Sequence, residues 1–444
     1  MTSTHAIGQR RNIWSRAAQV AAETPESRNR YVDFLRALSI GAVVIGHWLV
    51  AAPYLNGGEI SLENMLYYQP WTQWLTWAFQ VMSVFFIVGG YSNGVSWRSA
   101  QRSNRSYAEW LSGRLQRLVG PVLPLLFVWA LLGATAHWWG VDPRLIKLGS
   151  QIALIPIWFL AVYVGAVVLV PMTHAAWQRF GVWSFVALAV AAALDDTLFF
   201  AAKMRAVGWF NYPLVWLAVH QLGYAWRDGK LTGLWKVLPL SLGALLILVG
   251  LVTWGPYPLS MVSVPNEAVS NSLPPKLTML ALGVFQGGLL LALEAPLRRW
   301  LARMTPWTAT VLVNGMIMTI YLWHLSAMTL IAGLGLATGF AGLILVPGSG
   351  VWWLFRPVWI ALLLVALALF GLIFGRFERS AAGPGNLGAW RLVVGSAPVC
   401  GGLALLALDG VGGNGWLGIR IWVIALPFAG AALAGVNPLR SRPG

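Results

Sequence analysis

The chain has little charge and almost no cysteine. Only 10% of its 444 residues are charged while 58% are hydrophobic, which leaves too little polar surface for a soluble globular protein. Cys400 is the single cysteine, so the chain forms no internal disulfide and offers no cysteine pair to a metal. The sequence also lacks a zinc-ligand pattern, a phosphate-binding glycine loop and a dinucleotide fingerprint. We therefore expect no metal, no tightly bound cofactor and no redox chemistry.

Long apolar runs account for most of the sequence, and the mean hydropathy is +0.68. A transmembrane helix needs about 20 apolar residues, and twelve runs reach roughly that length. We predict an all-α fold and a polytopic membrane protein. The predicted spans lie near residues 34–54, 74–96, 118–139, 152–171, 181–198, 208–226, 234–254, 277–296, 309–332, 351–374, 389–408 and 416–436.

Acidic residues are scarce, with 14 against 30 basic ones and a formal net charge of +16. The basic residues fall between the apolar runs, so we expect no nucleic-acid partner. With the N-terminus in the cytoplasm, 22 of the 30 basic residues face inside and seven lie outside, setting Arg36 aside. This asymmetry predicts that both termini are cytoplasmic. Residues 1–29 have arginines but no apolar core, and we expect a disordered basic cytoplasmic tail there.

Arg36 and His47 lie eleven residues apart on the first apolar run. Eleven residues at about 100° each make roughly three helical turns, so both side chains project from one face, about 16 Å apart along the axis. An ionisable side chain inside a bilayer is costly, and by default it serves a transport path or a reaction.

Several short motifs point to one family. They are Asp33-Phe-Leu-Arg36 followed by His47, Val84-Phe-Phe-Ile-Val-Gly-Gly-Tyr91, Arg114-Leu-Gln-Arg117, Trp158-Phe-Leu160 with Tyr163, and Tyr321-Leu-Trp-His324. In this order and spacing they resemble the membrane-bound acyltransferase-3 family of carbohydrate and lipid O-acyltransferases. The resemblance covers about residues 30–375 and implies a ten-span acyltransferase-like transmembrane domain. Residues 376–444 are then additional transmembrane segments, with about two extra spans.

The sequence departs from the family pattern in the second span. The family's serine in the "FF-x-x-SGF" stretch is Gly89 here, and its phenylalanine is Tyr91. These departures affect local packing more than chemistry.

Acyl transfer from a thioester to a hydroxyl requires the hydroxyl proton to leave as the new bond forms. His47 is the candidate general base, because an imidazole titrates near neutral pH. Arg36 is a candidate to bind donor phosphate or to stabilise charge on the thioester oxygen, with Asp33 as its charge partner. Arg114 and Arg117 offer two guanidinium groups to the phosphates of an acyl-CoA donor. We thus name catalytic residues on one helix and a donor site at the inner surface.

Five further residues are candidates for substrate binding: His324, Tyr321, Trp158, Tyr163 and Arg356. His324 lies at a depth similar to that of His47, but equal depth does not establish proximity. Arg356 lies near the outer start of its span, where it could meet an anionic acceptor.

The candidate residues also have structural interpretations. His47 could hydrogen-bond inside the bundle, and Arg36 could anchor its helix at the inner surface. Arg114 and Arg117 belong to a basic loop that topology alone requires.

We expect an O-acyltransferase of a bacterial-type inner membrane. Its partners are membrane lipid, a short-chain acyl-CoA such as acetyl-CoA, and a hydroxyl of a cell-envelope glycan or glycolipid. The alternative from another class is a transporter of lipid-linked sugars that performs no covalent chemistry. Twelve spans suit a transporter, but the halves of the chain show no repeat of the kind common in secondary transporters.

Overall fold

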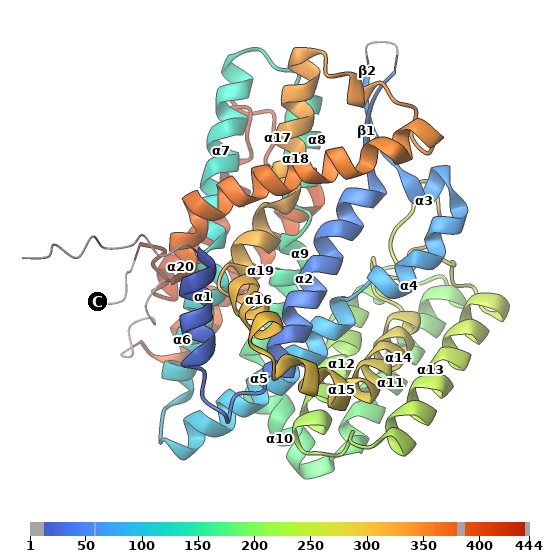
Figure 1. The fold of residues 1–444 in the computed structure, drawn as a ribbon, viewed down its shortest axis with the longest axis vertical. Helices are drawn as coiled ribbons and strands as arrows, with labels where there is room; N and C mark the ends of the chain where they lie inside the picture. Colours follow the sequence, from blue (N-terminus) through green and yellow to red (C-terminus); the bar gives the residue numbers. More distant parts are fainter. Residues whose placement is uncertain (1–12, 57–58, 380–386, 440–444) are drawn as a thin grey trace, which may run out of the picture.

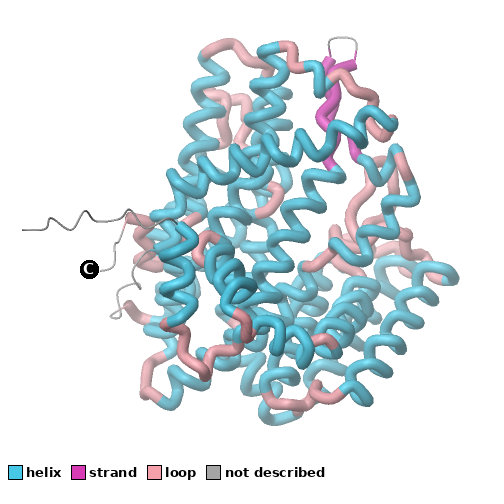
Figure 2. The backbone as a smooth tube through the Cα atoms, viewed as in Figure 1, coloured by secondary structure: helices cyan, strands magenta, loops and turns pink. Residues whose placement is uncertain are grey.

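The computed structural model describes residues 13–56, 59–379 and 387–439. Within this part almost all regular structure is helical, and the only sheet is one two-stranded hairpin. Figures 1 and 2 show the helices packed side by side, with the hairpin at one end of the molecule. Eight of the described helices are long and apolar enough to cross a membrane, or ten if each of two bent pairs forms one span. The predicted all-α, polytopic membrane fold is confirmed.

The first part of the chain leads from a short packed helix to the helix that carries the candidate site. Its elements are α1 (Ile13–Ala22), α2 (Arg30–Val50), β1 (Ala51–Asn56), β2 (Glu59–Asn64), α3 (Met65–Tyr68), the 3-10 helix η1 (Pro70–Leu75), α4 (Thr76–Phe79), α5 (Met82–Arg102), α6 (Tyr107–Val119) and α7 (Val122–Trp138).

Helix α1 differs from the disordered tail predicted for residues 1–29. Ala17 and Ala21 are buried, and Trp307 on α16 (Met304–Asn314) donates from Nε1 to the Ala21 carbonyl at 3.2 Å. Residues 13–22 contain no long apolar run, so the sequence alone does not predict a packed helix here. The face with Ala17 and Ala21 is buried because it packs against α16, which lies far away in the sequence. Residues 1–12 lie outside the described part of the chain.

Helix α2 starts and ends at recognisable signals. The Asn29 side chain accepts from Tyr31 N at 3.1 Å and caps the first turn, which also carries Asp33. The helix ends at Val50, where the backbone becomes extended and enters the antiparallel hairpin of β1 and β2. Arg36 therefore lies near one end of α2, and His47 lies about one turn before the hairpin.

The middle of the chain contains one bent pair of helices. Its elements are α8 (Pro143–Leu154), α9 (Ile157–Val168), α10 (Val170–Phe180), α11 (Val182–Phe200), the 3-10 helix η2 (Val207–Phe210) and α12 (Asn211–Arg227). α8 and α9 meet at 45° beside Pro156. Proline has no N–H and cannot continue the ladder of the preceding helix, so the chain turns there.

Helices α5 and α12 cross at two glycines. A Cβ atom built on Gly90 would lie 1.9 Å from the His220 carbonyl oxygen, and one on Gly223 would lie 2.1 Å from the Ile87 carbonyl oxygen. The two backbones thus touch directly, as small residues allow between membrane helices. This contact fixes α5, which carries several residues of the candidate site, against the buried helix α12.

The last part of the chain contains α13 (Leu234–Trp254), α14 (Leu277–Ala292), α15 (Glu294–Leu301), α16, α17 (Ile317–Thr338), η3 (Ala341–Leu343), α18 (Gly350–Phe374), η4 (Gly375–Arg379), α19 (Ala389–Asp409) and α20 (Ile421–Leu433). In Figure 1 the orange helix α18 crosses the front of the molecule at a steep angle to α2.

The structure differs from the twelve predicted spans at two places. The described part of the chain has at most ten candidate spans, and the 17-residue helix α12 and the 13-residue helix α20 are not among them. α20 starts late because the chain turns between α19 and α20 at Gly410 and Gly418, which both have positive φ. A hydropathy window registers that stretch as apolar but does not register its turns.

The crossing of α5 and α12 predicts a strong effect of one methyl group. We expect Gly223→Ala to destabilise the protein by at least about 1–3 kcal/mol, because the added Cβ meets backbone atoms that cannot rotate away. The measurement is the unfolding midpoint of the purified protein in detergent. Gly41→Ala on α2 is the matched control, since nothing lies within 4 Å of its added Cβ. Equal midpoints for the two variants would contradict the proposed backbone contact.

Candidate functional site

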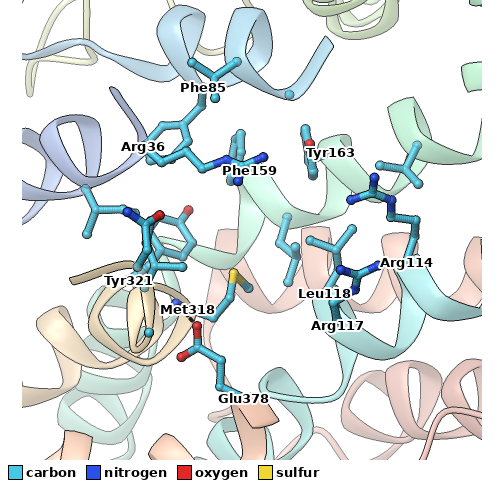
Figure 3. A pocket seen from close by; sticks show the side chains of 18 of the residues that line it. Arg36, Phe85, Arg114, Arg117, Leu118, Phe159, Tyr163, Met318, Tyr321 and Glu378 are labelled. Carbon is cyan, nitrogen blue, oxygen red and sulfur yellow. Dashed lines mark hydrogen bonds between the residues drawn. The ribbon is translucent and has the colours of Figure 1, made fainter. Parts of the chain in front are cut away.

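A cavity of about 1010 Å³ lies beside α2, at the end where the helix starts. Figure 3 shows Arg36 on one side of the cavity and Arg114 with Arg117 on the other. The size is at the upper end of typical ligand cavities, which are roughly 300–1,000 Å³. Positive charge exceeds negative charge in its lining. The charged lining residues are Arg28, Arg36, Arg114, Arg117, Arg376, Asp33 and Glu378.

Arg36 is held in place by two partners. Its Nη2 donates to Ser92 Oγ on α5 at 2.6 Å, and its Nη1 lies 3.3 Å from Asp33 Oδ1. The second oxygen of the buried Asp33 carboxylate accepts from Arg28 Nε at 2.6 Å. Asp33 thus bridges two arginines at the cavity wall. The structure supports its predicted contact with Arg36 and adds Arg28 and Ser92.

Arg114 and Arg117 lie one turn apart on α6 and both line the cavity. The Arg114 guanidinium donates to Ser96 Oγ and lies 5.6 Å above the ring centroid of Trp110. Ser96 is one turn after Ser92 on α5, so both serines lie on the same face of this helix. Ser92 binds Arg36 on one side of the cavity, and Ser96 binds Arg114 on the other.

Aromatic rings form the deep wall of the cavity. Phe159, Tyr163 and Tyr321 line it, and the Tyr321 hydroxyl donates to the carbonyl of Pro156 at the bend between α8 and α9. The candidate Trp158 does not line the cavity. It packs against Trp216, and their ring centroids lie 6.2 Å apart. Neighbouring positions on α9 point to different faces, and the short aromatic motif alone does not say which face meets the cavity.

Gly89 explains one departure from the family pattern. A Cβ atom at this position would lie 2.7 Å from the ring and the hydroxyl of Tyr163. The Tyr163 ring therefore occupies the space that a serine side chain would need. The cavity retains a tyrosine wall because residue 89 has no side chain.

Two segments that the sequence did not flag also line the cavity. Glu378, just after α18, accepts from the backbone N–H groups of Met318 and Thr319 at 3.0 and 3.1 Å and so caps the start of α17. Pro438 and Leu439, which follow α20, line the cavity near α6.

The side chain of Gln116 on α6 holds the C-terminal wall of the cavity, which is formed by Pro438 and Leu439. The buried Gln116 donates from Nε2 to the Asn437 carbonyl at 2.7 Å and accepts from Asn437 N at 3.0 Å. Gln116 lies between the two flagged arginines in the sequence. However, a side chain that pairs with a backbone more than 300 residues away leaves no local pattern.

His47 is not among the residues that line the cavity, although it shares α2 with Arg36. It lies beyond the cavity and pairs with His324 of α17. His47 Nδ1 lies 2.9 Å from His324 Nε2, and the two rings are nearly parallel. Trp48 donates from Nε1 to the His324 carbonyl at 3.0 Å. The structure therefore brings together the two histidines whose proximity the sequence left open.

The hydrogen bonds assign a proton arrangement to this pair. A carbonyl oxygen only accepts, so His324 Nδ1, which lies 2.6 Å from the Tyr321 carbonyl oxygen, carries a hydrogen. In a neutral His324 the Nε2 atom then has no hydrogen and accepts from His47 Nδ1. A neutral His47 consequently has its free lone pair on Nε2. His47 is partly exposed, whereas His324 is fully buried.

Tyr321 connects the cavity with the histidine pair. Its ring lines the cavity, and its carbonyl orients His324. The ring centroids of Tyr321 and His324 lie 6.2 Å apart. The histidine pair thus lies next to the cavity, and Tyr321 contacts both.

Arg356 lies apart from the cavity, on the buried face of α18, where its guanidinium stacks 3.4 Å from the ring centroid of Trp352. Among the described residues, no group of three or more His, Cys, Asp or Glu side chains is arranged to hold a metal ion.

The family model for Acyl_transf_3, an acyltransferase domain, matches residues 29–375. The chain therefore belongs to this acyltransferase family, and the resemblance based on the motifs is confirmed. No curated protein and no solved structure matches the chain.

The attachment of the C-terminal wall gives a prediction that needs no substrate. We expect Gln116→Leu to speed hydrogen exchange at the Asn437 amide by at least about fivefold, since that amide loses its acceptor. Gln151→Leu is the control, because Gln151 binds the Leu408 carbonyl in α19 and leaves Asn437 untouched. Unchanged exchange at Asn437 in the Gln116 variant would show that this contact does not hold the wall.

Proposed function

We propose that this membrane acyltransferase moves a short acyl group, such as acetyl, from acyl-CoA to a hydroxyl of a cell-envelope glycan or glycolipid. The main support is the geometry of α2, which joins an arginine-lined cavity at one end to a polarised histidine pair near the other. We place the protein in a bacterial-type inner membrane with both termini in the cytoplasm, on the strength of the distribution of basic residues.

The cavity suits a polyanionic donor. Arg36, Arg114 and Arg117 converge on it from two helices, and guanidinium groups bind phosphate in a fixed fork geometry. The basic loops favour a cytoplasmic location for this end of the molecule, which suits a cytoplasmic donor such as acyl-CoA. Ser92 and Ser96 hold two of the arginines in position before the donor binds.

The histidine pair suits general-base catalysis. His47 Nε2 accepts the proton of the acceptor hydroxyl as the hydroxyl oxygen attacks the thioester carbonyl carbon. The carbon–sulfur bond then breaks, the sulfur leaves as the thiolate of coenzyme A, and the proton passes from His47 to that thiolate. His324 Nε2 accepts from His47 Nδ1 throughout and stabilises the imidazolium that forms. Direct attack fits a chain whose only cysteine, Cys400, lies on α19, away from the pair.

The depth of the two groups suggests how donor and acceptor meet. His47 lies about 16 Å along α2 from Arg36, which is roughly half of a hydrocarbon core about 30 Å thick. The acyl end of the donor therefore passes Tyr321 to reach the base, and the acceptor approaches from the hairpin end. Coenzyme A stays on the cytoplasmic side while the acceptor is modified from the other side.

Removal of the base tests the function directly. We offer labelled acetyl-CoA and envelope extract to the purified protein, and we expect His47→Ala to lower label transfer by a factor on the order of 10² to 10⁴. His5→Ala is the control, because His5 belongs to the basic tail predicted for residues 1–29. Full transfer by the His47 variant would refute the base assignment. Movement of unmodified sugars without any label transfer would favour the transporter.

His324 acts through His47, and its role is positioning. We expect His324→Ala to lower kcat by about 10- to 100-fold while the KM for acyl-CoA stays unchanged, because the donor cavity lies on the other side of Tyr321. His324→Gln can still accept from His47 Nδ1 through its side-chain oxygen and should recover part of kcat. If His324 only supported the fold, both variants would show the same loss together with a lower unfolding midpoint.

A further inference from the structure

Arg356 is a buried cation that lacks an acidic partner among the described residues. It is 7% exposed and lies on one stripe of α18 with Trp352 and Trp359, the stripe that faces the rest of the protein. No salt bridge and no hydrogen bond involves Arg356 in that part of the chain, and its Nη1 atom is buried without an acceptor. A buried charge that is not paired is strongly destabilising.

Stacking satisfies only one part of this guanidinium. The Arg356 Cζ atom lies 3.4 Å from the ring centroid of Trp352 and 5.9 Å from that of Trp359. A cation–π contact uses the flat face of the guanidinium, while its N–H donors point outward in the plane. The edge of Arg356 is therefore available to acceptor atoms.

A second unsatisfied donor lies on the same stripe. Trp359, three residues later, is 3% exposed, and its Nε1 is also buried without an acceptor. Residues three apart on a helix are neighbours on one face. Two buried donors beside each other, with no acceptor of the described protein between them, match a ligand that supplies only acceptors.

The chain treats another buried cation differently. Lys276 is fully buried, and its Nζ lies 3.7 Å from the carboxylate of Asp196. Lys276 Nζ makes no hydrogen bond within the described part of the chain, but its charge has a countercharge within the protein itself. Among the described residues, by contrast, no acidic side chain offsets the charge of Arg356, which leaves room for a countercharge supplied by a ligand.

The position of Arg356 connects it with the acceptor end of α2. Trp352, on which Arg356 stacks, packs against Ala52 of the hairpin and Met65 of α3. Ala52 follows His47 by five residues. Arg356 thus lies at the hairpin end of the molecule. The histidine pair lies between it and the arginine-lined cavity.

We propose that Arg356 and Trp359 form a binding site for an oxyanion, a phosphate or carboxylate group, carried by the acceptor that enters at the hairpin end. Arg356 supplies the charge and its in-plane N–H donors, and Trp359 Nε1 supplies a further hydrogen bond. The link to the acceptor rests on the proposed acyl transfer, but the anion site itself does not. The substrate class is accordingly an anionic glycan or glycolipid rather than a neutral one.

Binding of small anions tests the site without any catalysis. The wild-type protein is placed in phosphatidylcholine nanodiscs, and its unfolding midpoint is followed against glucose 6-phosphate, glucuronate or glucose. We expect the two anionic sugars to raise the midpoint and glucose to leave it unchanged. Arg356→Met should weaken the apparent affinity for the anions at least about tenfold, since a charged buried hydrogen bond is lost. Trp359→Phe keeps the ring, loses the donor and should have a smaller effect in the same direction.

The matched control is Arg144→Met, an exposed arginine at the start of α8, which should bind the anions as the wild type does. Equal anion binding by the Arg356 variant, or equal stabilisation by glucose, would overturn the site. A second arm replaces part of the phosphatidylcholine with phosphatidylglycerol. An Arg356-dependent rise in midpoint with that lipid alone, and none with the anionic sugars, would identify a lipid headgroup and overturn the link to the acceptor.

Kinetics test the deeper part of the proposal. With acetyl-CoA as donor and glucose 6-phosphate as acceptor, Arg356→Met should raise the KM for the acceptor at least about tenfold and leave the KM for acetyl-CoA unchanged. An unchanged acceptor KM would refute the link to the acceptor even if the anion site is real. Failure of all acyl transfer in the wild type would refute the proposed function and leave the binding result standing.

Discussion

The contact between His47 and His324 determines how the rest of the site can work. The Tyr321 carbonyl fixes the proton on His324 Nδ1, which leaves His324 Nε2 as the acceptor for His47 Nδ1. Trp48 holds the His324 backbone from α2, so the same two helices that carry the histidines also fix their separation. Among the described residues, this orientation of the histidine pair involves no carboxylate. In a membrane interior that matters, because a buried carboxylate costs more than a neutral ring.

The molecule divides into three zones along α2. Arginines gather at the end where α2 starts, the histidine pair lies further along, and Arg356 lies near the hairpin. Tyr321 separates the first two zones and touches both, through its ring and its carbonyl. The shape of the cavity and the orientation of His324 therefore depend on the same residue. The contacts at Gly90 and Gly223 pack α5 directly against α12, and α5 carries the serines that bind Arg36 and Arg114.

Local periodicity accounts for the part of the site that could be predicted from the sequence. The shared face of Arg36 and His47 could be predicted because both lie on one uninterrupted helix. The contact of His47 with His324 could not, since the depth of a residue in a membrane says nothing about which neighbouring helix it faces. Gln116 and Leu439 were missed because their roles depend on where residues beyond α20 return to α6. The span predicted at residues 416–436 contains only the 13-residue helix α20, because apolar composition does not reveal the turn at Gly410 and Gly418.

The most direct test of this account is the tautomer of His47. Nitrogen-15 NMR of the histidine-labelled protein reports which ring nitrogens carry hydrogen, and the spectra of His47→Gln and His324→Gln assign the signals. The account predicts a hydrogen on His47 Nδ1, a free lone pair on His47 Nε2 and scalar coupling from His47 Nδ1 to His324 Nε2 across their hydrogen bond. A His47 ring with its hydrogen on Nε2 would contradict it, because the proposed mechanism requires Nε2 to take up the proton of the acceptor hydroxyl.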